Sequence, residues 1–176
     1  MGIIKEPLLV LPFCSLTFSD KVNLSLIENF LEKLFSPIKA HSGIIDFSKI
    51  TNYYDEEMGN NLKKIYYYFS ELQKPDNFHK YKIKTNKYEL NFYKNNLRLI
   101  NLDPGYITEA KLILFSVKDF AHRLYINNGI YAEVQLSYKK NSFTKNPWSY
   151  PDYLLHEIIL FFNGARDYLR KKLGRK

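Results

Sequence analysis

Residues 8–35 read LLVLPFCSLTFSDKVNLSLIENFLEKLF, and this stretch decides how the fold begins. Its opening run, LLVLPF, has the unbroken apolar character of a buried strand. Asn23 then opens a segment whose apolar residues recur at helical spacing, namely Leu24, Ile27, Leu31 and Leu34. Asn is a preferred N-cap residue, and Pro37 is expected to end the helix. The stretch therefore predicts a strand followed by an amphipathic helix.

Further strands and a weaker helix follow. SGIIDFS (42–48) is predicted to be a strand, and so is LKKIYYYFSEL (62–72), because its side-chain types alternate. TNYYDEEMGN (51–60) between them is predicted to be a polar turn. Residues 79–94 have a weak helical pattern, and LRLINL (97–102) favours a strand.

The last third of the chain completes the fold prediction. TEAKLILFSVK (108–118) suits either helix or strand, and Thr108 as a potential N-cap favours the helix. A β-hairpin is expected around Asn127-Asn128-Gly129, and Pro151 and Asp152 are expected to begin a C-terminal helix. The element order predicts an α/β (α+β) sandwich with a split β-α-β, ferredoxin-like core. Its mixed, mostly antiparallel sheet is extended by an α-β-β hairpin unit and followed by the C-terminal helix.

Length and cysteine content bound the class of protein. The 176 residues and 21.0 kDa suit one domain, 1–176, with one core. The lone Cys14 cannot form an internal disulfide and is expected in the core, and no His or Cys pair has zinc spacing. The apolar run near the N-terminus is too short to cross a membrane. We therefore expect a cytoplasmic protein, a monomer or homodimer, that has no membrane association, cofactor or metal.

Basic residues are concentrated in the middle and at the end of the chain. The net charge is +8, and residues 61–100 carry nine basic and three acidic side chains. Such a field attracts anionic partners, including phosphorylated metabolites and nucleic acid. No GxxxxGK[ST] or GxGxxG motif is present, which excludes an ordinary P-loop or Rossmann nucleotide site.

The hairpin prediction places two charged residues opposite each other. A three-residue loop with Gly129 left-handed pairs Ile126 with Ile130, Leu124 with Ala132 and His122 with Val134, leaving the apolar residues on one face. The other face then carries Tyr125 opposite Tyr131 and Arg123 opposite Glu133. The charged pair is either an exposed ion pair of about 0–1 kcal/mol or an arrangement in which Glu133 orients Arg123 for an anionic ligand. His122 is either a hydrogen-bonded core residue or a general acid or base.

Two further polar clusters lie near element ends. In NLDPGY (101–106), Asp-Pro-Gly predicts a turn after a strand, where Asp103 either bonds to its own backbone or contributes to a ligand site. In PWSYPDY (147–153), Trp148 is expected to cover an edge of the core.

These clusters also carry a family resemblance. Residues 53–59 (YYDEEMG), 101–114 (NLDPGYITEAKLIL), 116–138 (SVKDFAHRLYINNGIYAEVQLSY) and 147–153 resemble the domain of unknown function family 4416, of uncharacterised prokaryotic proteins. The resemblance implies a single-domain protein without an established activity. Its motif positions here are Tyr54, Glu57, Gly59, Asp103, Gly105, Lys111, Lys118, His122, Arg123, Glu133, Trp148 and Asp152. Phe120 and Ser149 depart from it, where Tyr and Thr are common, without removing a charge.

A pattern this rich in charged residues favours a site for a small anion, such as a phosphate or carboxylate. The ligand contacts expected from it are Lys111, Lys118, Arg123, Tyr54, Glu57 and Asp152. His122 or Glu133 would carry a proton and Asp103 would orient, so whether the protein is an enzyme stays open.

Two alternatives remain. An RNA-binding module would use the tyrosines of residues 66–68 and the basic tail, and a scaffold would present an apolar stripe of the last helix. That stripe comprises Ile158, Phe161, Phe162, Ala165, Tyr168 and Leu169.

Overall fold

The first strand and helix form as expected. The protein is described here by a computed structural model that covers residues 2–175, in which β1 spans Leu11–Ser19 and α1 spans Leu24–Leu34. The Asn23 side chain accepts a hydrogen bond from the backbone nitrogen of Ser25 at 3.1 Å, so the predicted N-cap is confirmed. β1 starts three residues later than LLVLPF predicted and continues past Cys14, which is buried as a free thiol.

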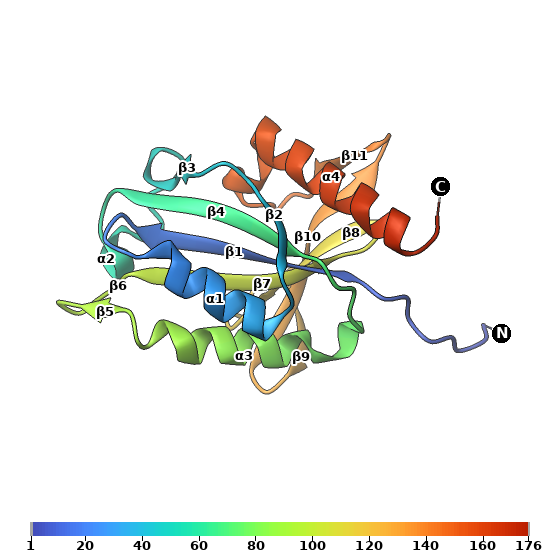
Figure 1. Cartoon of the computed structure of the whole chain (residues 1–176), viewed down its shortest axis with the longest axis horizontal. Helices are drawn as coiled ribbons and strands as arrows, with labels where there is room; N and C mark the ends of the chain where they lie inside the picture. The colour runs from blue at the N-terminus through green and yellow to red at the C-terminus, as the bar shows by residue number, and fades with distance from the viewer. Residues whose placement is uncertain (1, 176) are drawn as a thin grey trace.

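One large antiparallel sheet organises the chain (Figure 1). Its strand order is β11-β10-β8-β7-β1-β4-β2, with β3 paired to β4 and β9 paired to β10. The remaining strands of this sheet are β2 (Ile38–His41), β3 (Ile45–Asp46), β4 (Leu62–Phe69), β7 (Ile100–Ile107), β8 (Lys111–Ser116), β9 (Leu124–Asn127), β10 (Ile130–Lys139) and β11 (Ser142–Lys145). A separate small hairpin joins β5 (Tyr93–Lys94) to β6 (Leu97–Arg98). The other helices are α2 (Asp55–Met58), α3 (Phe78–Glu89) and α4 (His156–Lys172), with short 3-10 helices at Phe47–Lys49, Pro75–Asn77 and Pro151–Leu154.

Helices cover both faces of this sheet. Because strand side chains alternate, Cys14, Leu16 and Phe18 of β1 enter the core beneath α1 and α3, whereas Leu11 and Phe13 enter the core beneath α4 (Figure 1). The fold is thus α+β, with a mostly antiparallel sheet and a C-terminal helix. The apolar stripe of α4 packs on the sheet, since its members Ile158, Phe162, Ala165 and Leu169 are buried.

The helix predicted over residues 108–118 is wrong, because Lys111–Ser116 form β8 in the middle of the sheet. Its apolar residues are buried on both faces, and such a run carries no period that separates strand from helix. Thr108 makes the hydrogen bonds expected of a cap, accepting from the backbone nitrogens of Ala110 and Lys111 at 3.2 and 3.1 Å. These bonds close the tight turn between β7 and β8 instead of starting a helix.

The turn predicted at Asp103-Pro104-Gly105 is also wrong, because all three residues lie within β7. β8 pairs with β7 only from Gly105 onward, so Pro104 lies where β7 has β1 as its one sheet neighbour and its missing N–H is tolerated. An added Cβ at Gly105 would lie 2.2 Å from the carbonyl oxygen of Ile113. Glycine is therefore required here for close approach of β7 to β8.

The hairpin prediction is correct in part. Leu124 pairs with Ala132 and Tyr125 with Tyr131, but Ile130 pairs with Asn127 instead of Ile126, and the register shifts between Ile130 and Tyr131. Asn128 and Gly129 both have positive φ, 52° and 74°, so a two-residue turn replaces the predicted three-residue loop. The expected apolar face is buried only on β10, where Ile130 and Ala132 are 2% and 9% exposed, whereas Leu124 on β9 is 74% exposed.

Smaller differences concern three segments. Residues 42–48 hold only the two-residue β3, and the expected polar turn contains the short helix α2. Pro151 begins a 3-10 turn, and α4 starts at His156. Among residues 2–175, no helix is long and apolar enough to cross a membrane.

Candidate functional site

The central sheet is split between β7 and β8. β7 pairs with β1 along Ile100–Ile107, but with β8 only along Gly105–Ile107. The first half of β7 therefore has no partner on its other side, and a cavity of about 330 Å³ lies there. Its walls come from β7 and β6, from α3, from the loop before α2, from the end of β8 with the following loop, and from Tyr150.

α3 presents a polar face to this cavity. Its buried residues are Phe78, His79, Lys82, Thr85 and Glu89, and all but the first are polar. Lys82, Thr85 and Glu89 recur at helical spacing. The Lys82 ammonium donates to the carbonyl of Leu102 at 2.8 Å and to Asp103 Oδ1 at 2.9 Å. Lys82 thus reaches Asp103 along the open edge of β7.

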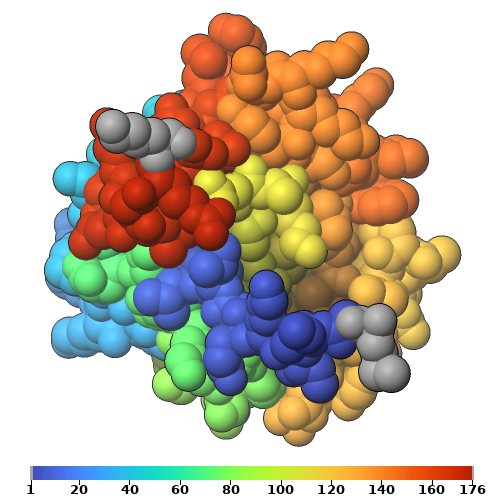
Figure 2. Space-filling view, turned by 90° about the vertical axis from the view of Figure 1, so that its right-hand side faces the viewer, coloured from blue at the N-terminus to red at the C-terminus, as the bar shows by residue number. Residues whose placement is uncertain are grey.

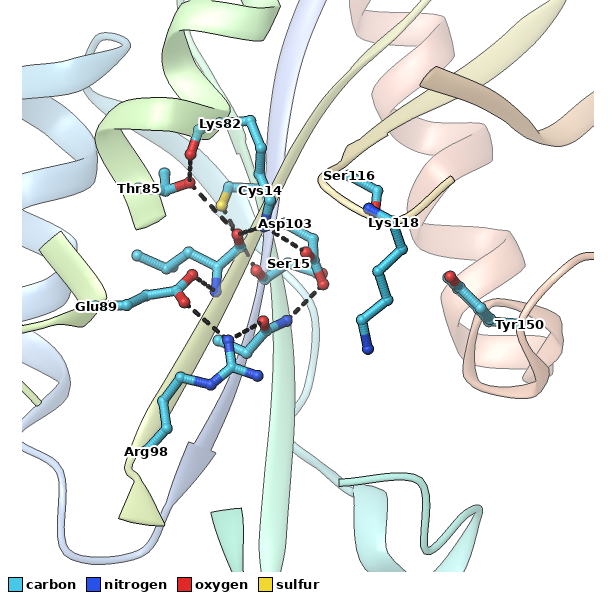
Figure 3. A network of polar contacts seen from close by, with 12 residues as sticks. Cys14, Ser15, Lys82, Thr85, Glu89, Arg98, Asp103, Ser116, Lys118 and Tyr150 are labelled. Carbon is cyan, nitrogen blue, oxygen red and sulfur yellow. Dashed lines mark hydrogen bonds and ion pairs between the residues drawn. The ribbon is translucent and has the colours of Figure 1, made fainter. Parts of the chain in front are cut away.

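The network continues from Asp103 toward the outer end of the cavity (Figure 3). Asn101 donates to Asp103 Oδ2 at 2.6 Å and accepts from Arg98 at 2.7 Å. Arg98 also donates to Glu89 at 2.9 Å and to Glu57 at 2.8 Å. Glu89 in turn accepts from the backbone nitrogen of Leu102 at 2.8 Å, so a chain of hydrogen bonds and ion pairs connects α2, α3, β6 and β7.

This network keeps Asp103 ionised. Burial raises the pKa of a carboxyl, but the charges of Lys82 and Lys64 and the hydrogen bonds from Lys82 and Asn101 outweigh it, so the pKa of Asp103 is lowered. Burial lowers the pKa of Lys82, and Asp103 and Glu89 raise it by more, so Lys82 stays charged. By contrast, burial raises the pKa of Glu89 above its ordinary value.

The opposite wall is formed by the loop after β8. Lys118 extends into the space between the Asp103 network and Tyr150, as Figure 3 shows. Its ammonium lies 2.8 Å from the Tyr53 hydroxyl and 3.9 Å from Glu57 Oε1. The side chain is 43% exposed, so this cation is open to solvent and only loosely paired.

Arg123 holds the same wall in place from behind. Its Nε donates to Glu133 at 2.9 Å, and one terminal nitrogen donates to the Ser116 hydroxyl and the Lys118 carbonyl, each at 2.8 Å. The other terminal nitrogen donates to the hydroxyl of Tyr150. The predicted Arg123–Glu133 contact is confirmed, but the pair is buried, with side chains 1% and 0% exposed, and is not an exposed cross-strand pair.

A second, smaller cavity adjoins the first. It measures about 160 Å³ and shares Tyr53, Tyr54, Asp103, Leu114 and Tyr150 with its neighbour. Its remaining lining residues are Phe47, Thr51, Lys64, Pro151, Asp152 and Tyr153. Here the Lys64 ammonium donates to Asp152 at 2.6 Å, and the hydroxyl of Tyr66 donates to the same carboxylate oxygen.

Comparison with known families gives one match. Residues 9–168 match the family described as Domain of unknown function (DUF4416). The chain belongs to this family. No curated protein and no solved structure matches this chain. Within residues 2–175, no three His, Cys, Asp or Glu side chains gather in a way that could hold a metal ion.

Half of the twelve DUF4416 motif residues singled out in the sequence line the two cavities. Tyr54, Glu57, Asp103, Lys118 and Arg123 line the first, although they come from three separate segments of the chain. Asp152 lines the second.

The two predicted proton carriers, His122 and Glu133, contact each other next to Arg123. His122 Nε2 is 2.8 Å from Glu133 Oε2, and its ring stacks on Trp148 with 5.2 Å between ring centroids. Neither His122 nor Glu133 lines the two cavities described above.

Lys111 lies elsewhere, at the other end of β8. It lines a separate hollow together with residues 7–10 and Leu169. Figure 2 shows this face, where the blue N-terminal segment, the yellow turn before β8 and the red end of α4 meet.

Several residues of the site were not predicted from the sequence, namely Lys82, Glu89, Arg98, Asn101, Lys64 and Tyr150. A signal for two of them was present. Lys82, Thr85 and Glu89 recur at helical spacing within the segment recognised as weakly helical. The pattern looked weak because the buried stripe is polar, whereas amphipathic helices are usually recognised by an apolar stripe.

Proposed function

We propose that this DUF4416 protein binds a small anionic molecule, carrying a phosphate or carboxylate group, in the split between β7 and β8. Four cationic side chains and three carboxylates line the larger cavity: Lys82, Arg98, Lys118 and Arg123 against Glu57, Glu89 and Asp103. Buried charges are costly unless they are paired, so this many in one cavity points to a function beyond folding.

The observation that carries the proposal is the position of Lys118. Lys82 is engaged by Asp103, Arg98 by Glu57 and Glu89, and Arg123 by Glu133, each at 2.9 Å or less. Lys118 has its nearest carboxylate 3.9 Å away and is open to solvent. A ligand anion could therefore contact this ammonium without breaking a buried ion pair, and the Tyr53 hydroxyl beside it would add a donor.

The surrounding groups favour binding over proton transfer. Burial raises the pKa of Tyr54 well above its ordinary value, and also raises that of Tyr150, so both keep their hydroxyl protons. Asp103 is held ionised, with both oxygens occupied. These groups are fixed donors and acceptors at neutral pH, and a general acid or base needs a pKa near the working pH.

The test compares two lysine variants in calorimetric titrations with inorganic phosphate, ribose 5-phosphate and succinate. Lys118→Met should weaken binding of the tightest of these by about tenfold or more, the cost of losing a charged hydrogen bond. Lys111→Met removes the same charge from an exposed position at the far end of β8, outside the cavity, and should leave binding unchanged.

Native mass spectrometry of the purified protein should accompany these titrations and detect any stoichiometric anion that copurifies. If both variants lose the same amount of anion affinity, the loss comes from the overall positive charge of the protein and not from a contact with Lys118. If none of the three anions binds and no anion copurifies, the proposal is wrong.

We also propose that the first six major elements form a ferredoxin-like unit. The strand order β7-β1-β4-β2 with antiparallel neighbours, and the position of α1 and α3 on one face, support this. The split that holds the cavity then separates the unit from β8, β10 and β11.

A cytoplasmic location is likewise proposed. The free, buried thiol of Cys14 fits a reducing compartment, and cell fractionation would test the location.

The RNA-binding alternative loses part of the evidence that suggested it. Tyr66 and Tyr67 are both 0% exposed, so neither can stack on a base.

A further inference from the structure

Two hydroxyl groups lie in the wall of the first cavity opposite Asp103. Ser116 is the last residue of β8, beyond the part of this strand that pairs with β7. Tyr150 directly precedes the 3-10 helix that leads into α4. Both residues are half-buried and line the cavity, and Figure 3 shows them with Lys118 on the side away from the Asp103 network.

The Ser116 hydroxyl can act only as a donor toward a ligand. Its oxygen accepts from a terminal nitrogen of Arg123 at 2.8 Å and from the backbone nitrogen of Lys118 at 3.1 Å. A serine oxygen has two lone pairs, so these two bonds use its whole capacity as an acceptor. Among residues 2–175, no group accepts its proton. The O–H of this residue is therefore available to a ligand in the cavity.

Arg123 imposes the same role on the Tyr150 hydroxyl. The other terminal nitrogen of Arg123 donates to this oxygen, and a guanidinium has no acceptor to offer in return. Burial raises the pKa of Tyr150 above its ordinary value, so the hydroxyl keeps its proton at neutral pH. In the part of the chain that the structure describes, nothing accepts this proton either. One buried guanidinium thus makes donors of two hydroxyls that border the cavity.

We propose that the ligand carries a fully deprotonated oxyanion, such as the dianion of a phosphate ester, and that Ser116 and Tyr150 donate hydrogen bonds to it beside Lys118. The inference rests on the proposed anion site and specifies which form of the anion this site takes. A fully deprotonated group offers only acceptors, whereas a protonated one would set an O–H against groups that also donate. The competing acceptor for such a proton is Glu57 Oε1, 3.9 Å from the Lys118 ammonium, and a site that used it would bind both forms.

The first test measures binding of ribose 5-phosphate by calorimetric titration at two pH values. The second pKa of a phosphate ester is about 6, so about a tenth of this compound is dianionic at pH 5 and nearly all of it at pH 7.5. Among the charged groups of the cavity, Glu89 has a pKa raised by burial. Sulfate, which keeps both charges throughout, is therefore titrated alongside to measure any change in the protein itself. Relative to sulfate, the affinity for ribose 5-phosphate should rise about tenfold from pH 5 to pH 7.5.

The outcomes separate this inference from the anion site. An affinity ratio that does not change with pH would overturn the inference and leave the anion site standing. If succinate binds and neither ribose 5-phosphate nor sulfate does, the inference is also wrong and the anion site stands. If no anion binds or copurifies, both are wrong.

The second test removes the two hydroxyls. Ser116→Ala and Tyr150→Phe should each weaken sulfate binding at pH 7.5 about tenfold or more, the worth of a hydrogen bond to a charged group. Ser116→Thr keeps the hydroxyl and should bind as the wild type does. Ser137→Ala is the matched control, because this half-buried hydroxyl on β10 donates to Asn146 and lines neither cavity.

Urea melts identify any variant that fails to fold, in which case the comparison of the two anions in the wild type decides. Unchanged sulfate affinity in folded Ser116→Ala and Tyr150→Phe would overturn the assignment of these two donors. An equal loss in Ser137→Ala would do the same, because the effect would then not depend on the cavity.

Discussion

Gly105→Ala should destabilise the protein severely, because it inserts a methyl group where β7 and β8 meet. The new Cβ would lie 2.2 Å from the carbonyl oxygen of Ile113 and 2.4 Å from a ring carbon of Phe13. Favourable contacts between such atoms begin near 3.5 Å, so the neighbours must move by roughly 1 Å. The carbonyl belongs to a central strand and the ring is 0% exposed, so neither moves freely. We expect a loss of about 3 kcal/mol or more, at the upper end of overpacking costs.

Gly164→Ala provides the opposite control. Gly164 lies inside α4 and an added Cβ would meet no atom within 4 Å, so the variant should gain about 0.5–1 kcal/mol from helix propensity. Urea denaturation followed by circular dichroism measures both free energies of unfolding. If Gly105→Ala unfolds within about 0.5 kcal/mol of the wild type, an effect typical of surface substitutions, then the close approach of β7 to β8 is not as described.

Two further predictions concern the buried charges. Arg123→Ala should lower the free energy of unfolding by about 3–5 kcal/mol because it leaves Glu133 buried without its guanidinium, and adding Glu133→Gln should restore part of this in urea melts. Because the pKa of Asp103 is lower in the folded than in the unfolded protein, its stabilisation is complete above the unfolded value of about 3.9 and is lost as the pH falls through the folded value. Asp103→Asn should therefore be less stable at pH 7 but lose less stability than the wild type between pH 5 and pH 3; parallel losses would contradict the assignment.

The burial of Arg123 also determines which variant can test function. From the sequence, Arg123→Ala could separate ligand binding from folding, because the residue was expected on an open hairpin face. In the structure, Arg123 fastens Ser116, the Lys118 carbonyl and Tyr150 together, so its removal would disturb the fold and the cavity at once. Lys118, which is 43% exposed, is the better position.

Local signals in the sequence were sufficient to predict those elements whose structure depends mainly on their own residues. The Asn23 cap, the apolar spacing of α1 and the alternation in β4 require no knowledge of distant residues, and all three are confirmed. The charged hairpin pair was predicted for the same reason. Its burial was not predictable, because part of the cover comes from Tyr150, which lies 27 residues after Arg123 in the chain.

Errors occurred where a local signal has two structural uses. The Thr108 hydroxyl binds backbone nitrogens two and three residues later, which suits a helix start and a tight turn equally. Pro and Gly in sequence usually mark a turn, yet Pro104 and Gly105 lie in an extended strand. Proline is tolerated at position 104 because β8 does not pair with β7 there. Glycine is required at position 105 because β8 lies very close to β7 at that residue.

These two residues place the candidate site at one defined position in the sheet. The strand β8 approaches β7 closely at Gly105, and β7 has no pairing with β8 at Pro104 and Asp103. Lys82 reaches Asp103 along the edge that is opened in this way. The sequence Asp-Pro-Gly thus combines an anchored carboxylate, a residue without an N–H and a residue without a side chain at the point where the sheet divides. The close packing of β7 on β8 and the cavity beside it therefore depend on the same residues. A change at Gly105 should alter ligand binding together with stability.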